Sequence, residues 1–402
     1  MIRFYYDVVC PYAYIASTRV QALAHEAGVG IEWVPVLLGG ILRSVGSPDR
    51  PGDLMNPNKA RLNVLDTLRQ ADLAGVSLVW PDTHPMRTVT AMRLLHAVDG
   101  AQRVALTRAL YRAYWCQGLD VTQVDVLQEI AAPFNLDVAS VNADPTIRQA
   151  LFDATDRAVS IGAFGVPTFE VDGRIFWGAD RMPLVRAALG LPRPARTEDG
   201  RAGARLTFFH DFSSPYSYLA STQVEQIARE QGAELERVPF LLGALFKELG
   251  TPGVPLHSFA EARQRYSMQD LLDHARWWDV DFRFASTFPL RTVTALRVAI
   301  AEPRTTDAIY RAAWVEDRDI GQPEVLHRVL DEAGFDGAAL LERTRDPAIK
   351  QQLFTNTARA ERQGACGAPT MVVDDQHVFW GQDRLEMVHR ALGDWRPPPH
   401  PA

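Results

Sequence analysis

The chain has 402 residues, of which 47% are hydrophobic and 23% are charged, and its formal net charge is −7. This composition is typical of a globular protein with a sizeable core and excludes a wholly disordered chain. The acidic balance argues against a general nucleic-acid binder, which usually carries a strong basic excess. At roughly 150 residues per domain, the length predicts two or three domains.

Targeting and metal-binding signals are not found in the sequence. No apolar run reaches the ~20 residues needed to cross a bilayer, and residues 1–7 lack the layout of a signal peptide, so we predict a cytoplasmic protein. The cysteines, Cys10, Cys116 and Cys366, form no CxxC pair, which argues against a disulfide framework or a zinc ribbon. Because neither an HExxH motif nor a Cys/His quartet occurs, we expect no metal site.

The first predicted elements have the order β-α-β. The aromatic and β-branched run 4–9 predicts a strand. Pro11 fits the first turn of a helix, where its missing N–H costs little, and helical spacing continues until Gly28 ends the helix. A second strand is predicted over residues 31–38.

A long helical stretch is predicted next, over residues 58–158, and a hairpin follows it. Strands 168–171 and 174–177 flank Asp172-Gly173, a strong two-residue turn signal. A last helix is predicted over 182–189. Without the helical stretch the order is βαβ–ββα, which is the thioredoxin arrangement, so the helices are predicted to form an inserted subdomain.

The same motifs return in the same order in the second half of the chain. Phe4–Ser17 is matched 204 positions later by Phe208–Ser221, Val34–Gly39 by Val238–Gly243, Pro85–Ala91 by Pro289–Ala295, Gly165–Thr168 by Gly367–Thr370, and Phe176–Arg181 by Phe379–Arg384. These collinear matches predict a duplication with a period of about 200 residues, which indicates two domains and not a solenoid. The predicted fold class is α/β, with two thioredoxin-like domains that each carry a helical insertion.

The predicted boundaries follow from this duplication. The first unit is 1–190 with its insertion at about 45–158, and the second is 205–393 with its insertion at about 250–358. Residues 191–204 contain Pro and Gly and are predicted to be a linker. The proline-rich residues 394–402 are predicted to be a loose tail.

Cys10 and Ser214 occupy equivalent positions, between the first strand and the first helix of each unit. A helix N-terminus offers free N–H groups and a partial positive charge, so we expect a lowered pKa for the Cys10 thiol. Ser214 does not ionise near neutral pH, but its hydroxyl can donate to the thiolate of another molecule. A small buried apolar residue at Cys10 and a helix cap at Ser214 are the alternative interpretations.

Each unit also has an X–Pro bond before its third strand, Val166-Pro167 and Ala368-Pro369. Few such bonds are cis in folded proteins, but in thioredoxin-like units a proline at this position is typically cis and faces the N-terminus of the first helix. The backbone of the preceding residue is then free to pair with a peptide-like ligand. A proline that opens an edge strand is the alternative.

Further along each unit, Asp180 and Asp383 lie two residues after a glycine and before the last helix. A carboxylate at this position can cap the helix or accept a hydrogen bond from a ligand's ammonium group. Trp115 and Trp314 are predicted to be core residues, with pocket lining as the second interpretation.

Jointly, the Asp–x–x–Ser–Pro–Tyr, Gly–x–Pro–Thr and Trp–Gly–x–Asp–Arg motifs resemble those of kappa-class glutathione transferases and 2-hydroxychromene-2-carboxylate isomerases, which are related to the DsbA-like oxidoreductases. The resemblance covers nearly all of both repeats and implies glutathione as the cofactor. It places the glutathione sulfur beside the serine of Ser214-Pro215-Tyr216. Cys10-Pro11-Tyr12 departs from this pattern by having Cys for Ser, and it departs from the oxidoreductases because Ala13 replaces their second Cys.

The resemblance also implies roles for other residues. Backbone contacts to glutathione are expected at Val166 and Ala368, before Pro167 and Pro369, and contacts to its glutamyl end are expected from Ala179-Asp180 and Gln382-Asp383. A lysine of the inserted region often contributes. Lys59 matches it in the first repeat, and Arg263 lies in the corresponding stretch of the second. Because this family commonly forms homodimers, the two fused units would form a pseudo-dimer within one chain.

We therefore predict a glutathione-dependent isomerase or transferase that acts on an electrophilic aromatic carboxylate-type small molecule, with Ser214 and Cys10 as catalytic residues. A monothiol thiol–disulfide oxidoreductase that uses Cys10 is one alternative. A non-enzymatic scaffold with decayed sites is another. No nucleic-acid or membrane partner is expected.

Overall fold

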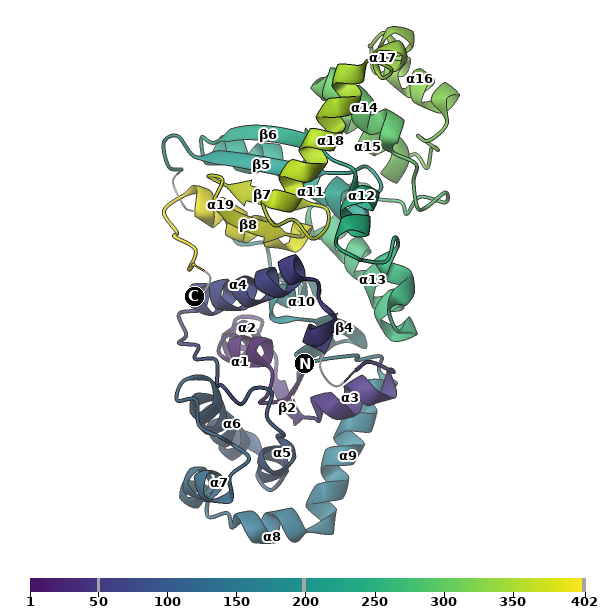
Figure 1. Cartoon of the computed structure of the whole chain (residues 1–402). Helices are drawn as coiled ribbons and strands as arrows, with labels where there is room; N and C mark the ends of the chain where they lie inside the picture. Colours follow the sequence, from purple (N-terminus) through teal and green to yellow (C-terminus); the bar gives the residue numbers. More distant parts are fainter. Residues whose placement is uncertain (49–50, 197–199, 400–402) are drawn as a thin grey trace. The chain divides into compact units, whose positions relative to one another are not determined.

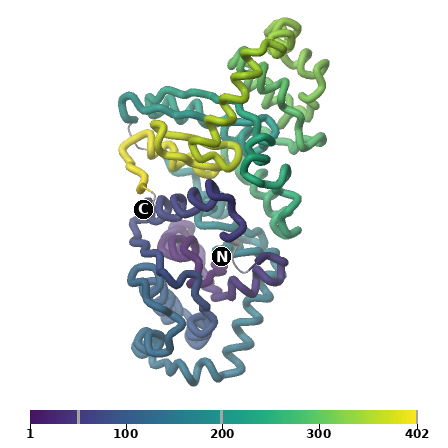
Figure 2. The backbone as a smooth tube through the Cα atoms, in the orientation of Figure 1, coloured from purple at the N-terminus to yellow at the C-terminus, as the bar shows by residue number. Residues whose placement is uncertain are grey.

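The computed structural model describes residues 1–48, 51–196 and 200–399. Residues 197–199 of the predicted linker and 400–402 of the predicted tail lie outside these ranges. The chain forms two compact units (Figures 1 and 2). Unit 1 comprises Met1–Asp53, Thr67–Pro194 and Phe259–Ser267, and unit 2 comprises Leu54–Asp66, Ala195–Ser258 and Met268–Ala402. These units differ from the expected ranges 1–190 and 205–393 because each includes a short segment of the other repeat.

Unit 1 is built on a four-stranded sheet of order β2-β1-β3-β4. Its strands are β1 (Ile2–Tyr6), β2 (Ile31–Pro35), β3 (Thr168–Val171) and β4 (Arg174–Trp177). Strand β1 is parallel to β2 and antiparallel to β3, and β3 and β4 form the predicted hairpin. Both Asp172 and Gly173 have positive φ, as a tight two-residue turn requires.

The helices of the first repeat are α1 (Pro11–Ser17), α2 (Val20–Glu26), α3 (Leu38–Ser44), α4 (Pro57–Leu73), α5 (Val89–His96), α6 (Gly100–Trp115), α7 (Val124–Ala131), α8 (Val138–Ala143), α9 (Pro145–Ser160) and α10 (Met182–Ala188). Short 3-10 turns lie at Pro51–Leu54, Ala132–Phe134 and Ala179–Arg181. The residues of α4 up to Asp66 belong to unit 2.

Unit 2 repeats this plan with a sheet of order β6-β5-β7-β8. Its strands are β5 (Arg205–His210), β6 (Glu234–Pro239), β7 (Thr370–Val373) and β8 (His377–Trp380). The helices of the second repeat are α11 (Pro215–Glu230), α12 (Leu242–Glu248), α13 (Glu261–Trp277), α14 (Val293–Ala301), α15 (Thr306–Trp314), α16 (Pro323–Glu332), α17 (Gly337–Arg343), α18 (Pro347–Arg362) and α19 (Leu385–Leu392), with 3-10 turns at Pro255–Ser258, Pro303–Thr305 and Gln382–Arg384. Residues 261–267 of α13 belong to unit 1. The βαβ–ββα order with helical insertions is the predicted thioredoxin-like fold, and it is confirmed in both units.

Two predicted elements of the first repeat have different bounds in the structure. The second strand ends at Pro35 because the N–H of Leu38 donates to the buried Asp7 carboxylate (2.9 Å), and α3 begins there. The first helix is divided into α1 and α2, whereas the equivalent α11 is continuous. At the break the N–H of Arg19 donates to the carbonyl of Ala16, three residues back, and its guanidinium donates to the Ala179 carbonyl. Gln223 stands at this position in the second repeat.

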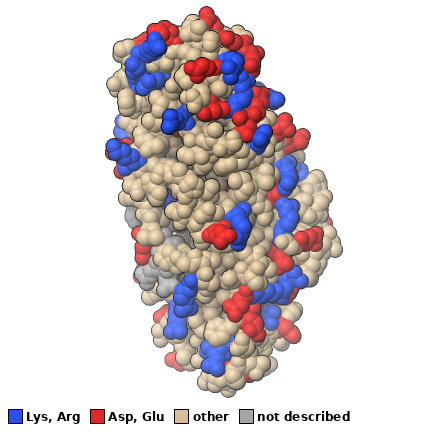
Figure 3. All heavy atoms as spheres, turned by 90° about the vertical axis from the view of Figure 1, so that its right-hand side faces the viewer, with Lys and Arg blue, Asp and Glu red and all other residues tan. Residues whose placement is uncertain are grey.

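Charged residues of both signs are interspersed on the face of the molecule in Figure 3. That face therefore lacks the single-sign basic surface that a nucleic-acid binder usually presents. Among the described residues, no helix is long and apolar enough to cross a membrane.

Two of the sequence motifs pack directly on each other in each unit. A Cβ added at Gly165 of the Gly–x–Pro–Thr turn would lie 2.7 Å from Nε1 of Trp177. The equivalent distance from Gly367 to Nε1 of Trp380 is 2.6 Å. The tryptophan of the Trp–Gly–x–Asp–Arg motif thus requires a residue without a side chain in the turn, which explains why the two motifs occur together.

We expect Gly165→Ala to destabilise unit 1 by about 1–3 kcal/mol, because the added methyl group must displace the Trp177 ring. Thermal unfolding followed by circular dichroism measures this as a lower melting temperature. Gly30→Ala is the control, because nothing lies within 4 Å of its added Cβ. Equal melting temperatures for the two variants would contradict the proposed Gly–Trp contact.

Candidate active site

In unit 2, Ser214 lies at the N-terminus of α11 and faces the residue before the cis bond Ala368-Pro369. Its Oγ donates to the Ala368 carbonyl (2.8 Å) and accepts from the N–H of Ser217 (3.1 Å). The helix-cap interpretation is therefore confirmed, and the same hydroxyl also bridges to the cis-proline turn. Only 4% of Ser214 is exposed.

In unit 1, Cys10 occupies the equivalent position before α1. Its thiol donates to the carbonyl of Val166 (3.2 Å), and the bond Val166-Pro167 is cis. Only 7% of Cys10 is exposed. The expected cis geometry is confirmed at both prolines, and each lies beside the first helix of its unit.

The expected lowering of the Cys10 pKa is wrong in this structure. Burial raises the pKa of the thiol to about 12, and the charge of Asp7 adds to the increase. The backbone N–H groups of Tyr12 and Ala13 at the start of α1 lower the pKa, as the helix N-terminus predicts, but the desolvation outweighs them. Cys10 is therefore a protonated hydrogen-bond donor here and not a thiolate.

A buried aspartate lies three residues before Cys10 and three before Ser214. Asp7 accepts hydrogen bonds from the N–H of Val9, the N–H of Leu38 and the hydroxyl of Thr88 (2.7 Å). Burial raises its pKa, and these hydrogen bonds oppose that effect. The Asp7 carboxylate thus connects the loop before the first helix with the loop after the second strand and with the helical insertion.

Asp211 makes the equivalent contacts in unit 2, with Ser213, Leu242 and Thr292. Burial likewise raises its pKa. Both aspartates belong to the repeated sequence motif, but no role for them was predicted from the sequence. Their repetition at the same spacing was the available signal.

Two tryptophans of the helical insertions form hydrogen bonds with the loops that precede the first helices. The indole Nε1 of Trp115 donates to the Val8 carbonyl (2.8 Å), and that of Trp314 donates to the Phe212 carbonyl (2.8 Å). Both tryptophans are fully buried. The core interpretation of these residues is confirmed, and they also fix the backbone that leads to Cys10 and Ser214.

The predicted glutamyl-binding pairs lie in 3-10 turns just before α10 and α19. In unit 1, Asp180 forms an ion pair with Arg181 (3.0 Å), and Ala179 accepts a hydrogen bond from Arg19. Gly178 and Arg181, the N-cap residues of the 3-10 turn and of α10, provide no side-chain cap.

Unit 2 shows the same arrangement. Gln382 is buried, and Asp383 forms an ion pair with Arg384 (3.2 Å). Gly381 and Arg384, the N-cap residues of the 3-10 turn and of α19, likewise provide no side-chain cap. Arg384 also binds Asp66, which belongs to unit 2.

The two cations of the inserted regions lie in the opposite units from those expected. Lys59 is part of unit 2, where its Nζ lies 5.6 Å from the ring centre of Trp380. Its charge also lowers the pKa of Cys366, although burial raises that pKa to about 12 overall. Arg263 is part of unit 1 and lies 5.4 Å from the ring centre of Trp177. Lys59 thus lies in the unit that contains Ser214, and Arg263 lies in the unit that contains Cys10.

The remaining predicted residues lie in the first turn of each helix. Pro11 and Pro215 are the first residues of α1 and α11. Tyr12 and Tyr216 follow them and are partly exposed. Sequence reasoning missed Tyr266, whose hydroxyl accepts a hydrogen bond from the N–H of Trp177 (2.9 Å) within unit 1.

Comparison with known proteins decides the family. The model of the DSBA-like thioredoxin domain matches residues 1–190 and again residues 205–393. The chain belongs to the DSBA-like thioredoxin domain family. It is a tandem duplication of that domain, as the repeated motifs predict.

Curated relatives of this DSBA-like chain match one repeat at a time. A 2-hydroxychromene-2-carboxylate isomerase of Sphingobium xenophagum is 29% identical over 196 residues, which cover 47% of this chain and 98% of the relative. Glutathione S-transferase kappa 1 of Homo sapiens is 28% identical over 211 residues, which cover 48% and 93%. These relatives are enzymes, and their names support an enzymatic role in general for the family.

Solved structures similar to this DSBA-like chain include a 2-hydroxychromene-2-carboxylate isomerase, at 22% identity and a TM-score of 0.41, which covers 47% of this chain and 94% of that chain. A probable DsbA oxidoreductase from Streptomyces coelicolor is 19% identical with a TM-score of 0.35, and covers 47% of this chain and 88% of that chain.

Within the described ranges no group of His, Cys, Asp and Glu side chains could hold a metal ion.

The raised pKa of Cys10 predicts slow alkylation by iodoacetamide. A thiol with a pKa of about 12 is almost fully protonated between pH 7 and 9, and only its thiolate reacts. The alkylation rate of Cys10 should therefore rise about tenfold per pH unit over this range. Mass spectrometry of the Cys10 peptide measures this rate, with the partly exposed Cys116 as an internal reference. A rate that levels off near pH 9, as expected for an ordinary thiol with a pKa of about 8.5, would contradict the prediction.

Proposed function

We propose that this protein is a glutathione-dependent isomerase or transferase, and that the reaction centre is Ser214 in unit 2. The proposed substrate is an electrophilic aromatic carboxylate-type small molecule, in line with the name of the isomerase relatives. The observation that carries the proposal is the 2.8 Å contact between Ser214 Oγ and the carbonyl of Ala368, before the cis-proline. A cytoplasmic location and a pseudo-dimeric pairing of the two units within one chain belong to the same proposal.

The hydrogen bonds around Ser214 suit a peptide-like ligand. A backbone carbonyl before a cis-proline is a natural acceptor for the N–H of an extended peptide. At present the Ser214 hydroxyl donates to that carbonyl. If a ligand N–H takes the Ala368 carbonyl, the hydroxyl becomes free to donate to the ligand's sulfur, while the Ser217 N–H still holds Oγ in place.

Charged groups of unit 2 fit the two ends of a tripeptide. Lys59, near Trp380, would bind a carboxylate, and Asp383 would accept the ammonium group of the glutamyl end. Gln382 is buried beside it and offers both amide donors and an acceptor. The residues present therefore fit glutathione, and the compact unit contains all of them.

When bound, glutathione would supply a thiol nucleophile for reversible addition to a conjugated carbon of the substrate. Ser214 would favour the ionised sulfur by hydrogen bonding. The first turn of α11 would add its unpaired N–H groups and the positive end of the helix dipole. Asp211 and Trp314 would keep the loop before Ser214 in place during the reaction.

Unit 1 favours a second candidate function because a cysteine replaces the serine. The Cys10 sulfur lies 3.2 Å from the Val166 carbonyl, in the arrangement of Ser214 and Ala368. Attack on glutathione disulfide by the small ionised fraction of Cys10 would form a mixed disulfide and release one glutathione thiolate. Because burial raises the Cys10 pKa, this exchange would be slow. Ala13 stands where a resolving cysteine would be, so this would be monothiol exchange. A scaffold role with decayed sites is the remaining alternative.

We expect Ser214→Ala to lower kcat/KM for glutathione addition to an electrophilic aryl acceptor by about tenfold to a hundredfold, because a hydrogen bond to a charged group contributes about 1.5–3 kcal/mol. Ser213→Ala is the matched control, since Ser213 contacts Asp211 through its backbone N–H, which the variant keeps. Calorimetric titration should give two glutathione sites in the wild type and a weakened second site in Ser214→Ala. A wild-type protein that binds no glutathione would refute the proposal.

We expect Cys10→Ser to abolish thiol–disulfide exchange and to leave the Ser214-dependent activity unchanged, because serine cannot form a disulfide but can make the same hydrogen bond. Exchange is measured as reduction of a glutathione mixed disulfide, and the isomerase or transferase assay is run in parallel. Exchange that survives in Cys10→Ser, with Cys116→Ser as the comparison, would rule out a redox role for Cys10.

A further inference from the structure

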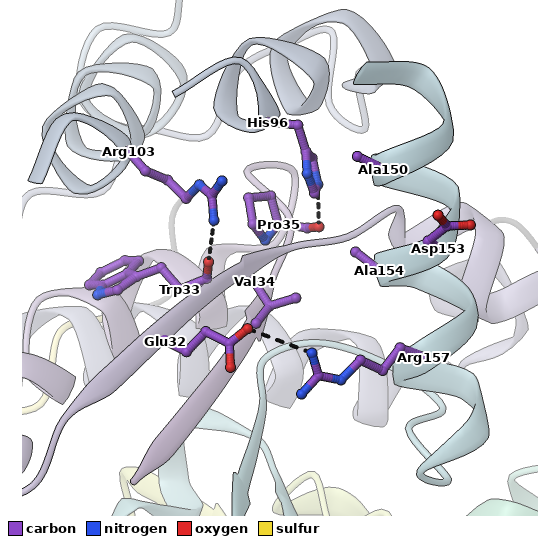
Figure 4. Close-up of a pocket in the computed structure, with 10 residues that line it drawn as sticks. All are labelled: Glu32, Trp33, Val34, Pro35, His96, Arg103, Ala150, Asp153, Ala154 and Arg157. Carbon is purple, nitrogen blue, oxygen red and sulfur yellow. Dashed lines mark hydrogen bonds and ion pairs between the residues drawn. The ribbon is translucent and has the colours of Figure 1, made fainter. Parts of the chain in front are cut away.

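A cavity of about 350 Å³ lies in unit 1 along the outer edge of β2 and does not include the Cys10 site (Figure 4). Strand β2 supplies Val34 and Pro35 to its wall, and α9 supplies Ala150 and Ala154. His96 of α5 and Arg103 of α6 approach the strand from the other side, as Figure 4 shows. The volume is within the ~300–1,000 Å³ range of small-molecule pockets.

The second repeat shows why this cavity exists. Equivalent hydrogen bonds align α9 of the first repeat with α18 of the second. Thr155 accepts from the N–H of Leu37, and Thr357 accepts from the N–H of Leu241. In that register Gln352 and Asn356 stand at the positions of Ala150 and Ala154.

In unit 2 these two amides fill the corresponding space. Asn356 donates to the Pro239 carbonyl (2.8 Å), and Gln352 donates to Asn356 (2.8 Å). Two alanines in unit 1 leave the space open, and His96 instead bonds the equivalent carbonyl of Pro35 (2.9 Å). Larger amide side chains therefore stand in the second repeat where two alanines line the cavity of the first.

Arg103 gives the cavity an unbalanced positive charge. Its guanidinium donates to the carbonyls of Leu95, Val98 and Trp33, which are neutral. Within the described ranges no carboxylate forms an ion pair with it. An anion in the cavity would provide that missing partner.

The acidic groups around the cavity have other partners. Glu32 is paired with Arg3 (2.9 Å) and lies 3.6 Å from Arg157. Asp153 accepts from Gln149, and Figure 4 shows its carboxylate pointing away from Arg103. His96 faces the Pro35 carbonyl with a ring N–H, and burial lowers its pKa, so the imidazole is neutral near pH 7. The lining therefore also contains Glu32, Asp153 and Arg157, but Arg103 is the lining cation that has no carboxylate partner among the described residues.

We propose that this cavity binds a small organic carboxylate, with the guanidinium of Arg103 as its cation and the apolar side chains of Val34, Pro35, Ala150 and Ala154 as the wall around its carbon body. Arginine suits this role because its planar guanidinium pairs with both oxygens of a carboxylate. The site is separate from the proposed glutathione site and does not depend on it.

Benzoate is the test probe, and benzamide, of nearly the same shape, is the neutral control. We expect benzoate to bind the full-length protein with a dissociation constant of about 1 mM or tighter, and benzamide to bind at least tenfold more weakly. Binding is followed by calorimetry and by the NMR signals of the His96 ring. Absence of saturable benzoate binding up to about 10 mM would overturn the proposal.

The sister repeat supplies the matched variant, Ala150→Gln with Ala154→Asn, which should fill the cavity and abolish benzoate binding. Arg103→Met should weaken benzoate at least tenfold and leave benzamide unchanged. Glutathione titration and the melting temperature are measured on each variant, so that loss of folding or of the other site is distinguished from loss of this one. Benzoate affinity that is unchanged in the filled variant would place its site elsewhere and overturn the proposal.

Discussion

The geometry of both candidate sites depends on one buried carboxylate in each unit. Asp7 and Asp211 each accept hydrogen bonds from two backbone N–H groups and one threonine hydroxyl, which come from three separate segments. Desolvation of a carboxylate is unfavourable, and loss of a partner from a buried hydrogen bond costs about 1–3 kcal/mol. The strand, the helix start and the inserted helices therefore keep one arrangement in which all three donors reach the same group.

Much of the fold follows from signals that are local in the sequence. The Asp172-Gly173 turn predicts the hairpin, and the spacing of Pro11 and Pro215 predicts the helix starts, because each depends on neighbouring residues alone. The cis bonds before Pro167 and Pro369 were predictable because the repeat fixes their place in a known arrangement. The pKa of Cys10 was not predictable, because burial depends on side chains distant in sequence and here outweighs the local helix terminus. The units that contain Lys59 and Arg263 were likewise not predictable, because they depend on which unit the helices of these residues pack with.

The duplication has produced two units with one scaffold and different chemistry. Cys10 and Ser214 make the same kind of hydrogen bond to a carbonyl before a cis-proline, but only one of them can form a covalent bond to sulfur. The same contrast appears at the sheet edge, where amides in one unit replace the alanines of the other. Each unit thus serves as an internal reference for the other, since both have the same sheet order and a cis-proline beside the first helix.

The composition of the compact units also bears on how such a chain could evolve. Unit 1 includes Phe259–Ser267 and unit 2 includes Leu54–Asp66, and each segment is encoded within the opposite copy. Deletion of one copy of the duplicated gene would remove part of the surviving unit, so the duplication is not easily reversed. Selection would then preserve both copies for structural reasons, even where the residues before the first helix, Cys10 and Ser214, differ.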